Sequence, residues 1–253
     1  MSNASQPVAE IAPGEVTLAP PRSDEAAFSP ASGSKRLRWF ELSLVLMIAF
    51  GDSLATGLYL YAKGRPTGYP GTYGPLIGLI HEAVALLLLG YVLYRRGLRF
   101  RDIGLRWSIS DLWTGPLVTV VSFLAYFAGR ILIHMTWHAI FGSAGRGLTA
   151  AEAFGFVSYS AIPLFLLNPF FEELIVRAYL MTEIRDLTGS SLLSILVSVV
   201  IQSSYHLYYG WQGALSLAFQ FLVFSIFYAR SRRITPVIIA HAFFDIIGLV
   251  QLW

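Results

Sequence analysis

Long apolar runs alternate with short polar or basic segments along the chain from residue 35 onward. A helix rises ~1.5 Å per residue, so about 20 apolar residues cross the ~30 Å hydrocarbon core of a bilayer. The pattern therefore predicts an all-α, polytopic transmembrane helical bundle with seven spans. We place these spans at about residues 40–62, 74–94, 115–141, 152–188, 190–208, 212–229 and 236–252.

The fourth apolar run, residues 152–188, is long enough for two spans and contains Asn168-Pro169. A reversal of the chain at this dipeptide would need more residues than it provides, so we expect one helix that is kinked at the proline. With one span here, the basic residues that end the fourth and sixth spans lie on the cytoplasmic side, where positive charge is usually found. Two spans would place both groups outside, which makes a total of eight spans the less favoured alternative.

The chain divides into a tail and one membrane domain. Residues 1–34 are rich in Ala, Ser, Pro and Gly and have no long apolar run, which predicts a disordered N-terminal tail. Residues 35–253 leave room for a single transmembrane domain, whose polar motifs lie at about residues 150–250. The basic residues at 35–38 predict a cytoplasmic N-terminus. We expect an integral protein of the inner or plasma membrane.

Composition supports a membrane protein and excludes several classes of function. Hydrophobic residues make up 55% of the chain and charged residues 13%, against about 25% charged residues in an average soluble protein. The net charge of +3 comes from basic residues at the edges of apolar runs, so we expect the lipid bilayer as a partner and no nucleic acid. The absence of cysteine excludes disulfides, thiolate metal ligands and a thiol nucleophile. The Gly-x-Ser-x-Gly motif of a serine hydrolase is also missing.

Three charged residues interrupt the fourth apolar run: Glu172, Glu173 and Arg177. Each charge near the centre of a membrane helix costs about 2.5–3.5 kcal/mol unless it is paired or faces a water-filled cavity, so such residues indicate a functional site. Glu173 and Arg177 are four residues apart and share a helix face, which allows the arginine to neutralise Glu173. Glu172 lies about 100° away around the helix and stays available for chemistry.

Further polar positions follow in later spans. His206 ends the fifth apolar run, and His241 and Asp245 lie four residues apart on one face of the last span. Glu172 and His206 are each 17 residues from Gly189 in the connecting turn, which places both about 26 Å along an antiparallel helix pair. His241 lies only about 9 Å from the start of its own helix, so tilt or unwound backbone is needed to bring it to their level.

The order Glu-Glu-x-x-x-Arg, His and His-x-x-x-Asp resembles the CAAX prenyl protease and bacteriocin-processing family of intramembrane endopeptidases, also called the Abi family. The motifs of that family are Glu-Glu-x-x-x-Arg, Phe-x-x-x-His, and His-x-x-x-Asn or Asp. The first and third are complete in this chain, whereas Gln202 replaces the phenylalanine of the second. Val176 and Ala178 also differ from the Phe and Gly that often flank the arginine. The resemblance implies a CAAX-protease-like glutamic endopeptidase that acts on a peptide or protein substrate at the membrane.

The residues themselves suit hydrolysis of a peptide bond by an activated water. An apolar setting makes Glu172 a stronger general base near neutral pH, and His206 can share the proton of the water. His241 would then donate to the oxyanion. The resemblance implies the same roles, with the paired glutamate and arginine of the first motif supporting the site and Asp245 helping at the oxyanion. We expect no cofactor and no metal ion, and the predicted catalytic residues are Glu172, Glu173, Arg177, His206, His241 and Asp245.

Three alternatives stay open. The same carboxylates and imidazoles could instead bind zinc or iron in a metal-dependent membrane protease, although the helical His pair of common zinc proteases is missing. The protein could also bind or protect without catalysis, as a bacteriocin immunity protein does. Other polar residues within spans could form a site of their own: His81, Glu82, Arg130, His134 and His138. The sequence does not predict an oligomeric state.

Overall fold

The structure is a computed structural model, and it describes residues 34–63, 74–142 and 159–251. Every regular element in these ranges is a helix, so the predicted all-α class is confirmed. The long helices before residue 142 are α1 (Lys35–Lys63), α2 (Gly74–Arg95) and α3 (Asp111–Phe141). Those toward the C-terminus are α7 (Ser191–Tyr205), α8 (Gly210–Ser231) and α9 (Thr235–Gln251). Short 3-10 helices are η2 (Phe100–Ile103), η3 (Tyr159–Ala161) and η5 (Leu207–Tyr209).

The segment that carries the first motif forms one continuous helical run. In this run α5 (Ile162–Glu172) is followed directly by the π-helix η4 (Glu173–Tyr179) and by α6 (Leu180–Thr188). Pro169 lies inside α5, so the chain does not reverse at this proline. The irregular backbone comes after the proline, where the Leu180 amide donates to the Ile175 carbonyl five residues earlier. The first residues of the predicted fourth span, 152–158, and the predicted tail up to residue 33 lie outside the described residues.

Four helices in the described ranges are long and apolar enough to cross a membrane: Lys35–Tyr59, Gly74–Arg95, Asp111–Ile140 and Leu207–Ser231. Two more apolar helices, Ser191–Tyr205 and Thr235–Leu249, are shorter. At ~1.5 Å per residue, a helix of about 15 residues extends about 22 Å, which is less than the ~30 Å hydrocarbon core. The protein is therefore an integral membrane protein with four spanning helices by length and composition. The predicted count of seven or eight spans goes beyond this finding and stays a prediction.

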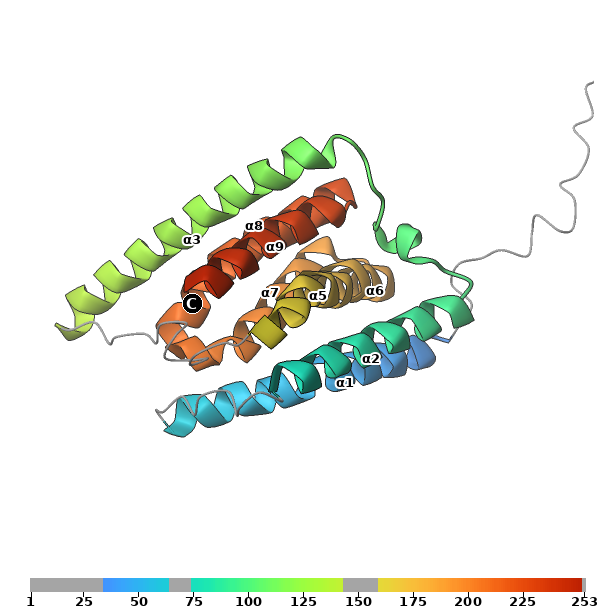
Figure 1. The fold of residues 1–253 in the computed structure, drawn as a ribbon, viewed down its shortest axis with the longest axis horizontal. Helices are drawn as coiled ribbons and strands as arrows, with labels where there is room; N and C mark the ends of the chain where they lie inside the picture. Colours follow the sequence, from blue (N-terminus) through green and yellow to red (C-terminus); the bar gives the residue numbers. More distant parts are fainter. Residues whose placement is uncertain (1–33, 64–73, 143–158, 252–253) are drawn as a thin grey trace, which may run out of the picture. The chain divides into compact units, whose positions relative to one another are not determined.

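The run α5–η4–α6 is surrounded by other helices. Both α2 and α9 pack against α5, and α7 packs against η4 and α6. In turn, α1 contacts α2 and α7, while α3 packs along α8 and α9 (Figure 1). All residues of η4 are buried. The charged side chains of the first motif are therefore enclosed by protein and do not face lipid.

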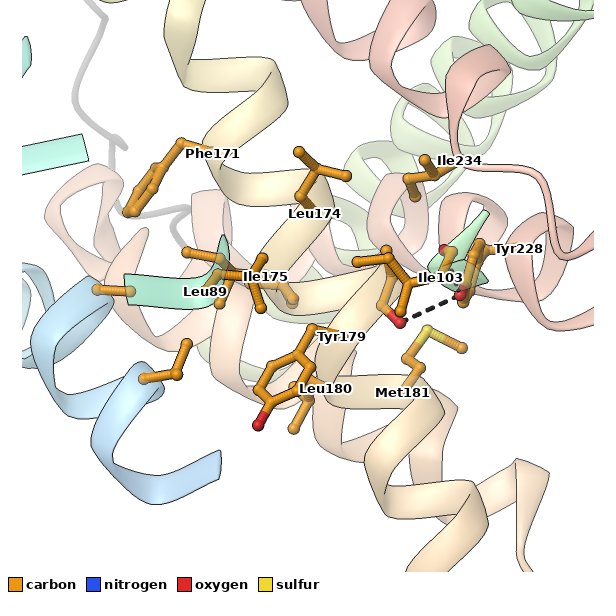
Figure 2. Close-up of a cluster of buried hydrophobic side chains, with 14 of the residues drawn as sticks. Leu89, Ile103, Phe171, Leu174, Ile175, Tyr179, Leu180, Met181, Tyr228 and Ile234 are labelled. Carbon is orange, nitrogen blue, oxygen red and sulfur yellow. Dashed lines mark hydrogen bonds between the residues drawn. The ribbon is translucent and has the colours of Figure 1, made fainter. Parts of the chain in front are cut away.

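Apolar side chains pack around η4 and fix its position. Figure 2 shows Ile175 and Tyr179 of η4 in a cluster that includes Leu89 from α2 and Tyr228 from α8. The Tyr228 hydroxyl donates to the carbonyl oxygen of Ile103 at 2.9 Å, drawn as a dashed line in Figure 2. A buried hydroxyl needs such a partner, since an unpaired one costs about 1–3 kcal/mol. This contact ties α8 to η2 within the core.

The outer faces of α1, α2 and α3 carry large apolar side chains. Met47, Leu87 and Leu117, one from each helix, are 67%, 73% and 62% exposed. Soluble monomers rarely expose large contiguous apolar patches. These faces are therefore suited to contact with lipid.

A buried ion network outside the motifs joins α1, α2 and α6. Arg96, which directly follows α2, donates from Nη1 to Glu183 at 2.7 Å and from Nε to Glu41 at 2.7 Å. Arg38 of α1 donates to the other oxygen of Glu183 at 2.9 Å. Arg96, Glu41 and Glu183 are each less than 10% exposed. Because buried charges must be paired, this network holds the end of α6 against α1 and α2.

Candidate active site

Glu173 and Arg177 form the ion pair that their spacing predicts. Arg177 Nη1 donates to Glu173 Oε1 at 2.6 Å, and neither side chain is exposed. The guanidinium carbon of Arg177 also lies 5.4 Å and 5.3 Å from the ring centres of Phe221 and Phe224 on α8. Contacts between a cation and aromatic faces are strongest when both are desolvated. The pair is therefore held by α8 as well as by its own helix.

His241 contacts the first motif through Glu173. Its Nδ1 lies 2.7 Å from Glu173 Oε1, the same oxygen that accepts from Arg177. Because a carboxylate oxygen only accepts, Nδ1 carries the proton in this contact. Its Nε2 lies 3.5 Å from Oδ1 of Asp245, four residues further along α9. Helix α9 therefore reaches the level of η4, and the difference in depth expected from the sequence does not separate the two motifs.

Asp245 is also held from α5. The side-chain amide of Asn168 donates from Nδ2 to Asp245 Oδ2 at 3.2 Å. Asn168 was expected only to form part of a kink. A polar residue four positions before Glu172 in an apolar run was the available signal that Asn168 belongs to the site.

Glu172 accepts two hydrogen bonds from α7. Gln202 Nε2 and Tyr205 Oη each lie 2.7 Å from Glu172 Oε2. The Tyr205 ring in turn stacks on Phe50 of α1, with ring centres 4.8 Å apart. Neither donor is among the predicted site residues. The signal that could have found them is their position, since both lie within four residues before His206.

His206 forms the C-terminal cap of α7. Its Nδ1 lies 2.8 Å from the backbone carbonyl oxygen of Gln202. A carbonyl oxygen only accepts, so Nδ1 carries the proton, and Nε2 of the neutral ring is left as an acceptor. The ring packs against Tyr205 at 4.7 Å and Phe221 at 5.1 Å between ring centres. His206 thus lies beside a residue that binds Glu172, with no direct hydrogen bond between His206 and Glu172 in the described structure.

Gln202 completes the network, because its Oε1 accepts from Arg177 Nη2 while its Nε2 donates to Glu172. Continuous contacts therefore run from Glu172 through Gln202 and the ion pair to His241. His206 joins them through the main chain of Gln202. The structure brings the six predicted site residues together, and their catalytic roles stay predictions.

The alternative set of polar residues does not form one site. His81 bonds a backbone carbonyl of α1 at 2.7 Å. Helix α3 carries Arg130, His134 and His138, all exposed, and packs against α8 and α9. Helix α2, which carries His81 and Glu82, packs instead against α1 and α5. Glu82 is buried, and its Oε2 has no hydrogen-bond partner within the described residues.

The side chains of the network that could bind a metal ion are engaged in hydrogen bonds with other protein groups. Glu173 Oε1 is shared by Arg177 and His241, and Glu172 Oε2 is shared by Gln202 and Tyr205. Across the described ranges, no three His, Asp or Glu side chains are grouped so that they could hold a metal ion.

Comparison with known proteins identifies the motif-bearing segment. Residues 155–247 match the family model described as "Type II CAAX prenyl endopeptidase Rce1-like". Over these residues the chain is similar to the CAAX protease family. The match includes all six predicted site residues, and it confirms the resemblance to CAAX proteases that the motifs indicate. Searches of curated proteins and of solved structures gave no match.

Proposed function

We propose that the protein is an intramembrane glutamic endopeptidase that hydrolyses a peptide bond with a water activated by Glu172 and His206. The observation that carries this proposal is the fixed carboxylate of Glu172, which is enclosed by protein and bound by two donors from the helix that ends at His206. A general base must be held in one place to take a proton in the transition state.

Glu172 and His206 would share the proton of the attacking water. Both hydrogen bonds to Glu172 fall on Oε2, so Oε1 would take one proton of the water as its oxygen attacks the carbonyl carbon, and would give that proton to the leaving amine when the C–N bond breaks. His206 carries its own proton on Nδ1, and its Nε2 would accept from the same water. General base catalysis of this kind contributes about 10²–10⁴-fold to a rate.

His241 would stabilise the oxyanion of the tetrahedral intermediate. Its Nδ1 is bound to Glu173, which fixes the plane of the ring. A doubly protonated imidazole donates from both nitrogens, so Nε2 would donate to the oxyanion while Nδ1 stays on Glu173. Asp245 lies on the Nε2 side and, in its protonated form, would also donate to the oxyanion. Arg177 balances the charge of Glu173.

The proposed substrate is a peptide or protein at the membrane. The matched family is described as a CAAX prenyl endopeptidase. A CAAX sequence is a cysteine followed by the last three residues of a chain. We propose that the enzyme acts in the inner or plasma membrane with its N-terminus in the cytoplasm, which the basic residues before the first apolar run support.

The test uses the full-length protein in lipid nanodiscs with fluorogenic CAAX peptides, farnesylated and unmodified, beside a library of membrane peptides. Glu172→Gln keeps the size of the side chain and removes the base. We expect wild type to cleave at least one substrate class and Glu172→Gln to lose 100-fold or more in kcat, within the range of about 10²–10⁴ for a general base. Full activity of Glu172→Gln, or an inactive wild type on every substrate, would contradict the proposal.

A further inference from the structure

Gln202 contacts both Arg177 and Glu172 at the position where the second family motif has phenylalanine. We propose that Gln202 is a positioning residue, which fixes the carboxylate of Glu172 by coupling it to Arg177. The inference deepens the proposed function and rests on it. A phenylalanine at this position has neither a donor nor an acceptor and could not make the coupling.

The chemistry of the two partners determines which way the amide points. Arg177 can only donate, so the atom of Gln202 that faces it must be the oxygen. An ionised Glu172 can only accept, so the atom that faces it must be the nitrogen. The usual ambiguity of a side-chain amide is therefore resolved. Among standard side chains of this length, glutamine accepts at one end and donates at the other without any change of protonation.

The same residue fixes both members of the proposed water-activating pair. The side chain of Gln202 binds Glu172, and its backbone carbonyl oxygen lies 2.8 Å from Nδ1 of His206. Gln202 is fully buried, so water does not compete for either contact. One residue of α7 therefore holds both the Glu172 carboxylate and the His206 imidazole in place.

The coupling also connects Glu172 to the positive charge of the first motif. Glu173 is already shared by Arg177 and His241, and the second nitrogen of Arg177 turns to Gln202. Hydrogen bonds in a chain of this kind polarise one another in a buried site. A base that moves by about 1 Å can lose about 10²-fold in rate, so loss of the coupling should affect turnover strongly.

Two variants of the full-length protein test the inference on the farnesylated fluorogenic CAAX peptide, or on the best substrate found above. Gln202→Glu accepts from Arg177 and, when ionised, cannot donate to Glu172. Gln202→Met has a similar shape and makes neither bond. Both keep the backbone carbonyl that binds His206. We expect kcat to fall about 10–100-fold in both variants, with KM changed less than about threefold.

Ser198→Ala is the matched control. Ser198 is fully buried one turn earlier on α7, and its hydroxyl lies 3.4 Å from that of Ser225 on α8, so it joins two helices without contacting Glu172. We expect this variant to lower the melting temperature and to keep the wild-type kcat. A structural role of Gln202 would instead make its variants behave as Ser198→Ala does.

The outcomes separate the inference from the proposed function. Loss of kcat in the Gln202 variants at unchanged KM, with Ser198→Ala active, supports the positioning role. Wild-type kcat in Gln202→Met, with Glu172→Gln inactive, overturns the positioning role and leaves the proposed function in place. Wild-type activity of Glu172→Gln overturns both. Should Gln202→Met fail to fold, the kcat of Gln202→Glu decides whether Gln202 has the positioning role, because this variant retains a partner for Arg177.

Discussion

Glu173 Oε1 lies 2.7 Å from Nδ1 of His241, and this contact joins the first and third motifs across 68 residues of sequence. The same oxygen accepts from Arg177 at 2.6 Å. Glu173 is therefore more than the counterion of Arg177, since it sets the orientation of the imidazole that we assign to the oxyanion.

Glu173→Gln should lower kcat by 100-fold or more. An amide that replaces a buried carboxylate no longer fixes the tautomer and charge of the imidazole, and losses on the order of 10⁴-fold are known for such a change in a serine protease. The substitution also leaves Arg177 buried without its counterion, which costs about 3–5 kcal/mol of stability. Turnover and thermal unfolding are measured side by side.

The double variant Glu173→Gln/Arg177→Met separates these two effects. Removing both charges should recover much of the stability that the single variant loses, because no buried charge is left unpaired. The kcat should stay low, since His241 still lacks its carboxylate and Gln202 has also lost its contact with Arg177. Recovery of kcat in the double variant would show that Glu173 acts only through stability.

Asp245→Asn should retain activity within about tenfold of wild type. Asn168 donates to Oδ2 of Asp245, so an asparagine here would turn its oxygen to Asn168 and its nitrogen toward the oxyanion position, where it donates beside Nε2 of His241. Orientation of His241 would persist through Glu173. A 100-fold loss of kcat with an intact fold, about 2.7 kcal/mol in the barrier, would instead mean that Asp245 must be a carboxylate.

Removal of metal ions should leave turnover unchanged. The proposed water activation uses Glu172 and His206 alone, so purified enzyme treated with a strong chelator should keep its kcat and contain no stoichiometric metal by elemental analysis. Activity that is lost on chelation and restored by zinc would favour the metal-dependent mechanism.

Arg96→Met should destabilise the fold without changing the chemistry. It leaves Glu41 and Glu183 buried without this partner, which costs about 3–5 kcal/mol. Arg101→Met is the control, because Arg101 is 63% exposed and its nearest carboxylate, on Asp102, is 3.8 Å away. A lower melting temperature for Arg96→Met alone, at equal kcat, is the expected result. Equal melting temperatures of the two variants would mean that the buried network contributes nothing to stability.

The sequence predicted the parts of the site that depend on local spacing. The separation of four residues between Glu173 and Arg177 places them on one side of their helix, and the structure shows that pair. Equal distances from Gly189 predicted that Glu172 and His206 would lie at one level. In the structure Glu172 binds Gln202 and Tyr205, which come shortly before His206, and not His206 itself.

The contacts that depend on packing between helices were not predictable in this way. Gln202, Tyr205 and Asn168 have ordinary roles elsewhere in helices, and what they bind depends on which helix lies opposite. The depth of His241 was underestimated, because helix length alone does not give the position of α9 relative to η4. The π-helical backbone at residues 173–179 was also missed, since most of these residues are apolar and carry no turn or capping signal.

The π-helix η4 has a consequence for the phase of the helix that contains it. Its wider turns use more residues than α-helical turns, so side chains after Tyr179 point in a different direction from those that an uninterrupted α-helix would give. Upstream of this segment Glu172 and Glu173 face α7 and α9, and downstream Glu183 faces the arginines at the ends of α1 and α2. Deleting a single residue between 173 and 179 would rotate one set against the other by about 100°. The π-helical segment therefore sets the angle between the side chains before it and those after it, so that one helix contributes to both the motif site and the buried ion network at Glu183.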